Sequence, residues 1–178
     1  MKILRALFSG LLMLITGCSS PKVEDYAANT PILDIRSYLN GEIDAWGMFF
    51  DNAGKADPMF HVKMTATWQG NNGTLNEHFI YNDGSTQDRV WHLTFTDDHH
   101  FTATAADVVG TAIGTQFGNA ANIKYVLSVK TKDGSSYDMS MDDWLYKLND
   151  NLVVNRNEMR KFGIKVGELV ISFHKQEK

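Results

Sequence analysis

The sequence predicts an all-β protein in which about eight to ten antiparallel strands follow one another as an up-and-down meander. In the segment 60–68, FHVKMTATW, every second side chain is apolar, which is typical of a strand with one buried face. Asn-Gly and Asp-Gly pairs at 72–73, 83–84 and 133–134 favour tight hairpin turns between such segments. Short turns between consecutive strands indicate a meander rather than a parallel arrangement.

The same alternation continues along the chain in VWHLTF at 90–95, YVLSV at 125–129 and ELVISF at 168–173. One short helix is expected within 32–41, ILDIRSYLNG, because Asn-Gly is a favourable helix end. A meander of this many strands hides its edges by closing on itself. We therefore expect a lipocalin-like barrel or a strongly curved sheet, with a flat sandwich as the alternative.

The N-terminal segment predicts export. Lys2 and Arg5 precede an apolar stretch at 7–15, and this stretch is too short for a membrane-spanning helix. The following ITGC resembles the lipobox of bacterial lipoproteins, which implies cleavage after Gly17 and a lipid on the sulfur of Cys18. The alternative is an ordinary signal peptide with an incidental cysteine.

These features predict the domain organisation. Residues 1–17 form the lipoprotein signal peptide, 18–31 form the lipidated N-terminus and its tether, and 32–178 form a single β-barrel-like domain. Ser19 follows the cysteine where retention in the inner membrane would usually show Asp. By that resemblance we expect a bacterial envelope protein anchored by its lipid at the periplasmic face of the outer membrane.

The composition excludes several function classes. The formal net charge of −4 and the lack of a basic cluster argue against nucleic-acid binding. The six histidines show no metal-ligand spacing, and no phosphate-binding or nucleophile motif is present, so we expect no metal, no cofactor and no catalytic residue. Oligomeric state is left open.

Two short motifs, a series of glycines and a pair of aspartates, could carry either structure or function. Gly110, Gly114 and Gly118 are four residues apart, so on one strand they would share a face, either to allow curvature or to make room for a ligand. Asp142 and Asp143 are neighbours and would point to opposite faces of a strand, which favours structural ion pairs over a catalytic pair.

The aromatic residues exceed what a single thin sheet can hide. Four tryptophans and ten phenylalanines either fill a barrel core or line a cavity for an apolar ligand. These two alternatives cannot be separated from the sequence.

Several longer motifs carry a family resemblance. They are YNDGSTQDRVW at 81–91, AADVVGTAIGTQFGNA at 105–120, MDDWLY at 141–146 and VNRNEMRKFGIKVGELVISFHK at 154–175. In this order they resemble the bacterial lipoprotein family called domain of unknown function 3833, over about residues 32–175. The family name states that no activity is established, so the resemblance supplies no catalytic residues.

The motif positions define the candidate ligand-binding or structural residues: Arg89, Trp91, Asp107, Gly110, Gly114, Gly118, Asp143, Trp144, Asn155 and Arg156. Asp83, Gly84, Phe162 and Gly163 belong to the same motifs. We expect Arg89 and Arg156 each to pair with Asp107 or Asp143.

The leading expectation is a lipid-anchored barrel that binds or carries a small apolar or lipid-derived molecule. An interaction lipoprotein that docks an envelope partner is the alternative. An enzyme acting on lipids or envelope polymers is a third possibility, and it would need Asp143, Arg156 and a histidine in one cleft.

Overall fold

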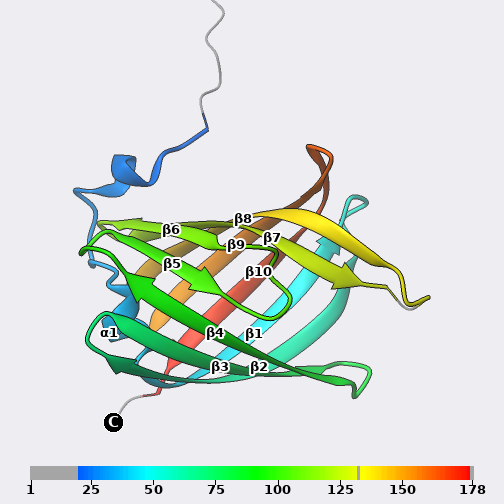
Figure 1. Cartoon of the computed structure of the whole chain (residues 1–178), viewed down its shortest axis with the longest axis horizontal. Coiled ribbons are helices and arrows are strands. Elements are labelled where there is room, and N and C mark those ends of the chain that lie inside the picture. The colour runs from blue at the N-terminus through cyan, green and yellow to red at the C-terminus, as the bar shows by residue number, and fades with distance from the viewer. Residues whose placement is uncertain (1–19, 132, 177–178) are drawn as a thin grey trace, which may run out of the picture.

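The computed structural model describes residues 20–131 and 133–176, and these form a closed antiparallel β-barrel (Figure 1). The helical elements are η1 (Val23–Tyr26) and α1 (Ile35–Leu39). The strands are β1 (Gly41–Asp51), β2 (Ala56–Gln69), β3 (Asn72–Tyr81), β4 (Thr86–Phe95), β5 (His100–Thr104), β6 (Ala112–Phe117), β7 (Ala120–Lys130), β8 (Ser136–Asn149), β9 (Leu152–Lys161) and β10 (Ile164–Lys175). The predicted all-β meander is confirmed, and the flat sandwich is wrong.

Each strand pairs with its neighbour in sequence, and β1 also pairs with β10, which closes the barrel. In the register of this closure Ala45 lies opposite Val62 of β2 on one side and Phe173 of β10 on the other. Closure gives every β1 backbone group in this region a partner within the sheet. It also sends alternate side chains of each strand into one common interior.

The predicted short helix, α1, covers one end of the barrel (Figure 1). Its N-cap Asp34 accepts a hydrogen bond from the backbone N–H of Arg36. The Tyr38 hydroxyl donates to the carbonyl oxygen of Phe173 at 2.8 Å, and the side-chain oxygen of buried Gln116 accepts from the Ile35 N–H at 3.0 Å. These bonds tie the helix to β6 and β10, so this end is the closed end.

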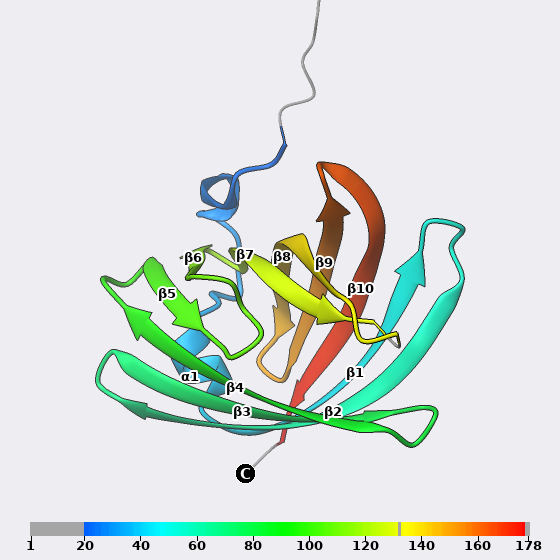
Figure 2. The same cartoon turned by 45° about the vertical axis from the view of Figure 1, so that its right-hand side comes forward.

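The core lies in the half of the barrel next to α1. Its inward side chains are almost completely hidden, with Ala45 and Val153 at 0% and Phe101 at 1% exposure. Farther along the same strands the inward side chains are only half-buried, as for Phe49, Leu127 and Met159. The hairpin turns at that end also spread apart in Figure 2. The barrel is therefore packed in one half and open in the other.

The segment expected to be a tether is partly folded onto the barrel. Within η1, Val23 is buried, and the Tyr26 ring lies 5.8 Å from Trp144 and 5.5 Å from Tyr146 on the outer face of β8. Cys18 and the predicted signal peptide lie outside the described residues. In the described part of the chain, no helix is long and apolar enough to span a bilayer.

The expectation that three glycines share one strand face is wrong. Strand β6 includes only Gly114, while Gly110 lies in the preceding loop and Gly118 in the following turn, both with positive φ. A Cβ on Gly114 would overlap the ring of Phe101, and a Cβ on Gly118 would overlap the backbone oxygen of Tyr26. Gly114 therefore makes room for a core aromatic ring and not for a ligand.

We expect Gly114→Ala to lower the free energy of unfolding by about 1–3 kcal/mol, because the new methyl group overpacks the core against Phe101. Urea denaturation measures the change. Adding Phe101→Leu to the variant should restore part of the loss, and Ile113→Ala on the exposed side of the same strand is the control. A fully stable Gly114→Ala protein would contradict this packing.

Candidate ligand-binding site

The barrel wall is interrupted on one side of its open half. Strands β5 and β6 are short, so β4 residues 86–91 have no ladder partner on their facing edge, and β7 residues 125–130 have only the isolated bridge between Leu127 and Val108 there. The loop 105–111 between β5 and β6 spans this interval, and its backbone bonds to β7. The backbone N–H of Val109 donates to the Val126 oxygen at 2.9 Å.

This loop positions Asp107 beside Arg89 of β4. The Arg89 guanidinium donates to the Asp107 carboxylate from Nε at 2.9 Å and from Nη2 at 2.7 Å. Its Nη1 atom also lies 3.7 Å from Glu77, the residue directly opposite on β3. The Arg89 guanidinium therefore interacts with two carboxylates, those of Asp107 and Glu77, and it links the loop 105–111 to β4 of the sheet.

Aromatic rings surround this ion pair. The Arg89 guanidinium lies 5.4 Å from the ring centre of Phe79, and Trp91 donates from its indole N–H to Glu77 at 3.3 Å. The Trp91 ring meets Tyr125 of β7 edge-on at 5.5 Å. The Trp91 and Tyr125 rings thus connect the polar groups of β3 and β4 to strand β7.

A second polar group lies on β8 and β9. The Asn155 amide donates a hydrogen bond to Asp143, and the Asn157 amide donates to the Tyr125 hydroxyl at 2.9 Å. Asn155 and Asn157 are 2% and 4% exposed. The side-chain oxygen of Asn157 is buried and has no hydrogen-bond partner in the described structure. We call Glu77, Arg89, Asp107, Tyr125, Asp143, Asn155 and Asn157 the interior polar cluster.

Burial raises the pKa of Glu77 to about 7, although the Arg89 charge and the Trp91 hydrogen bond act in the opposite direction. Burial also raises the pKa of Asp143 to about 7, opposed by the Asn155 hydrogen bond and reinforced by the charge of Glu77. The pKa of Tyr125 is raised by burial and by the charge of Asp143. Burial therefore disfavours the charged forms of both carboxyls, and the neighbouring groups compensate for it only in part.

The charges and hydrogen-bonding groups of the cluster offset only part of this burial cost. The cluster contains three carboxyl groups, those of Glu77, Asp107 and Asp143, and the single guanidinium of Arg89, which gives a net charge of −2 when all are ionised. The unpaired Asn157 oxygen adds another acceptor. The Glu77, Arg89 and Asp107 side chains keep 12%, 17% and 26% exposure, so solvent reaches them. The cluster is therefore accessible to solvent and has more hydrogen-bond acceptors than donors.

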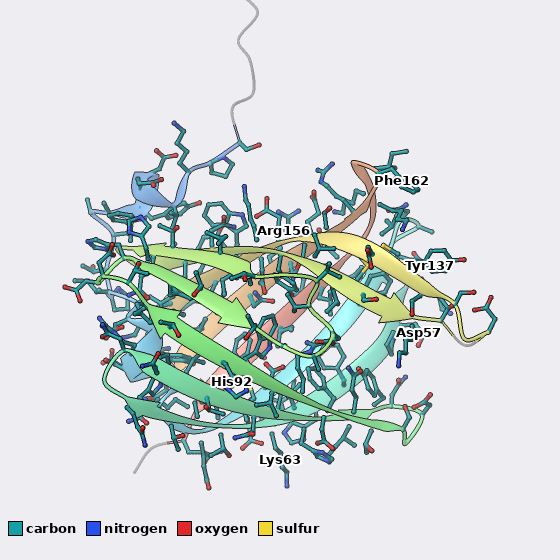
Figure 3. All side chains as sticks on the ribbon, viewed as in Figure 1. Asp57, Lys63, His92, Tyr137, Arg156 and Phe162 are labelled. Carbon is teal, nitrogen blue, oxygen red and sulfur yellow. The ribbon has the colours of Figure 1, made fainter. Side chains whose placement is uncertain are left out.

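The two best-defined depressions, of about 300 Å³ each, lie elsewhere. One is at the rim beside the β1–β2 turn and includes Asp51 and Lys165, and the other includes Thr67 and His92. Figure 3 shows His92 beside β4, away from the open end. Both are open to solvent, and neither includes a residue of the interior polar cluster. Polar and half-buried apolar side chains converge instead in the interior of the open half.

The structure brings together five of the candidate residues from the sequence. Arg89, Trp91, Asp107, Asp143 and Asn155 all belong to or contact the interior polar cluster. The expected Arg89–Asp107 pair is present.

Two other candidates lie outside the barrel. Trp144 stacks on Tyr146 at 5.9 Å on the outer face of β8. Arg156 is 54% exposed (Figure 3) and pairs with Glu168 at 3.0 Å, so its expected pairing with Asp107 or Asp143 is wrong. The side chains at 155 and 156 point to opposite faces of β9, and this separates Arg156 from the cluster.

Three cluster residues were missed in the sequence: Glu77, Tyr125 and Asn157. Glu77 had a detectable signal, because alternation places it on the same face as Leu75 and Phe79. A charged residue on an otherwise apolar strand face marks a buried polar site. Tyr125 and Asn157 had no comparable signal.

The geometry also limits the chemistry. Asp142 points outward and accepts a hydrogen bond from Asn122 at 2.7 Å, whereas Asp143 points inward, so the two carboxylates do not form a pair. Asp143 and Arg156 lie on different faces, which removes the arrangement that the enzyme hypothesis needed. In the part of the chain that the structure describes, no three potential ligands gather around a metal position.

Comparison of folds identifies the class as a lipocalin-like β-barrel. The S-type phycobiliprotein lyase CPES from Guillardia theta is similar with a TM-score of 0.61 and 6% sequence identity, over 89% of this chain and 99% of that chain. At this identity the similarity concerns the fold alone. A comparison with curated protein sequences finds no significant match.

The family is defined by the sequence itself. Residues 12–175 match the family described as protein of unknown function (DUF3833), so this chain belongs to that family. The predicted resemblance to this family is confirmed, whereas the lipoprotein signal peptide stays a prediction.

The two raised carboxyl pKa values predict how stability depends on pH. Between about pH 4.5 and pH 7 the native protein binds more protons than the unfolded chain, so the free energy of unfolding should fall as pH rises and level off above about pH 8. Glu77→Gln should reduce this slope. Thermal denaturation at constant ionic strength measures it.

Asp138→Asn on the exposed surface of β8 is the matched control and should keep the wild-type slope. Carboxyls whose pKa is lowered, such as Asp34 and Glu168, change stability at more acidic pH and do not overlap this window. Stability that rises from pH 5 to pH 7 would contradict the assignment.

Proposed function

We propose that this protein is a lipid-anchored binding protein of the bacterial envelope, at the periplasmic face of the outer membrane. Its barrel binds a small amphiphile whose apolar part lies in the open half. The polar end of the ligand carries hydrogen-bond donors or a positive charge and lies against Glu77, Asp143 and Asn157.

The observation that carries this proposal is the surplus of acceptors in the interior polar cluster. Buried polar groups are normally paired, and an unpaired one costs about 1–3 kcal/mol. Here the Asn157 oxygen is unpaired, and Glu77 and Asp143 both have pKa values near 7. A bound ammonium or N–H group would satisfy these acceptors and remove the repulsion between the carboxylates.

The apolar part of the ligand has a matching surface. Inward side chains of the open half remain half-buried, and they come from strands around the whole barrel: Phe49, Tyr81, Leu127, Met139, Met159 and Leu169. Such a surface is concave because the barrel is closed. Two methionines give it the adaptability that is common in binding surfaces.

A ligand with a carboxylate head fits less well. Arg89 is the only cation of the interior polar cluster, and Asp107 already binds it through two nitrogens while Glu77 lies 3.7 Å away. A further anion would meet Glu77 and Asp143 without a free cation. The charge balance therefore favours a cationic or donor-bearing head over an anionic one.

The binding test uses three probes with the same alkyl chain, namely decylammonium, decanol and decanoate, measured by titration calorimetry at pH 7. The barrel strands all lie within residues 41–175, so a chain that begins at Ser19 keeps the complete barrel. We expect decylammonium to bind at least about tenfold more tightly than decanoate, which corresponds to about 1.4 kcal/mol. Asp143→Asn should reduce this preference.

Leu127→Trp fills the open half and should weaken binding of all three probes, whereas Ile113→Trp on the outer wall should not. If none of the probes binds, the ligand-binding function is wrong. If decanoate binds as tightly as decylammonium and Leu127→Trp abolishes both, the apolar binding surface is correct and the head-group assignment is wrong.

The membrane anchor is tested at Cys18. In cells that produce the full chain, mass spectrometry of the mature N-terminus should find a diacylglyceryl group on Cys18, and Cys18→Ser should remove both the lipid and the cleavage after Gly17. A Cys18→Ser protein that is still cut at this bond and stays in the membrane fraction after a high-salt wash would refute the anchor.

A further inference from the structure

The turn between β9 and β10 exposes two large apolar side chains at the open end of the barrel. Phe162 is 91% exposed and Ile164 is 70% exposed, the highest values among the large apolar residues described. Figure 3 shows Phe162 at the outermost part of this turn. Phe162 also has a φ of 50°, a conformation that bulky residues rarely adopt and Asn or Gly adopts readily.

The other short turns at this end are different. Their tips, NAGK at 52–55, NDGS at 82–85 and DGS at 133–135, contain no large apolar residue, although the β9–β10 turn shares with them a glycine of positive φ, Gly163. The three other turns form without an exposed phenylalanine, so the fold does not require one at this position. The apolar tip of the β9–β10 turn therefore calls for an explanation outside the fold.

The apolar tip lies in a basic part of an acidic chain. Between Arg156 and Glu168 the sequence has four basic and two acidic residues, which gives a net charge of +2, whereas the whole chain carries −4. Lys161 lies over the Phe162 ring at 4.8 Å and over Tyr137 at 5.2 Å, with no carboxylate bonded to it among the described contacts. Aromatic and cationic groups that lie side by side are typical of surfaces that enter the lipid headgroup region.

The position of this turn relative to the N-terminus is consistent with a membrane partner. Figures 1 and 2 both place η1 and the β9–β10 turn on the same side of the barrel, at the top of each view. Strands β3 and β4 lie on the opposite side in both views. A single flat surface could therefore meet the N-terminal part of the described chain and the Phe162 tip together.

We propose that the β9–β10 turn docks on an anionic lipid bilayer, with Phe162 and Ile164 inserted among the headgroups and Lys161 beside the lipid phosphates. This contact is separate from the lipid on Cys18. With two contacts to the membrane, the lipid anchor and the β9–β10 turn, the barrel takes a fixed orientation, whereas the lipid anchor alone would leave its orientation free.

Vesicle binding of the chain that begins at Ser19 tests the contact without the lipid anchor. Sedimentation compares vesicles of phosphatidylcholine alone with vesicles of phosphatidylcholine and phosphatidylglycerol. We expect binding to the anionic vesicles that decreases with salt. The double variant Phe162→Asn/Ile164→Thr should reduce it at least about tenfold, because two apolar side chains no longer insert.

The chosen replacements separate binding from folding. Asn suits the positive φ at 162 and Thr suits a strand, so the variant should fold as well as the original. The matched control is Ile80→Thr/Val90→Thr, which removes two exposed apolar side chains from β3 and β4 on the opposite side.

The two variants give clear outcomes. Equal losses in both would show nonspecific binding and would overturn the proposal. Absence of binding to either kind of vesicle would also overturn it, and would indicate a protein partner for the tip. Loss in the first variant alone, with unchanged thermal stability, supports it.

Discussion

The hydrogen-bonded pairing of β1 with β10 is the constraint on which the rest of this structure depends. It converts a row of hairpins into a closed wall, so that alternate residues of every strand face one interior. In the half next to α1, Gly114 leaves room for the ring of Phe101, and α1 covers the end. In the open half the same alternation brings polar groups from strands far apart in sequence into one site.

The interior polar cluster is costly for stability and is therefore informative about function. A packed apolar interior would avoid the desolvation of Glu77 and Asp143, whose raised pKa values reflect that cost. Arg89 offsets part of it by binding Asp107 and lying near Glu77, and it also holds the β5–β6 loop over the interrupted wall. Groups that are kept despite such a cost are candidates for ligand recognition, because a ligand can complete the missing interactions.

Much of the fold could be predicted because it follows from local rules. Alternation in segments such as 60–68 and the Asn-Gly or Asp-Gly turns directly indicated a meander, and the pairing of Arg89 with Asp107 was anticipated. The three glycines were misjudged because spacing alone cannot show where a strand ends, and β6 ends just before Gly118. Arg156 was misjudged because its partner Glu168 is on the adjacent strand and on the outer face.

The sequence by itself determined the strands, their order and the family to which the chain belongs, since each of these depends on neighbours along the chain or on motifs in order. Only the tertiary structure decided which polar residues meet. Glu77, Tyr125 and Asn157 come from three different strands, and their proximity follows from closure of the barrel and from its register. A shift of one residue in any strand would move its side chain to the outer face, which is why such a site can be recognised only after the chain has folded.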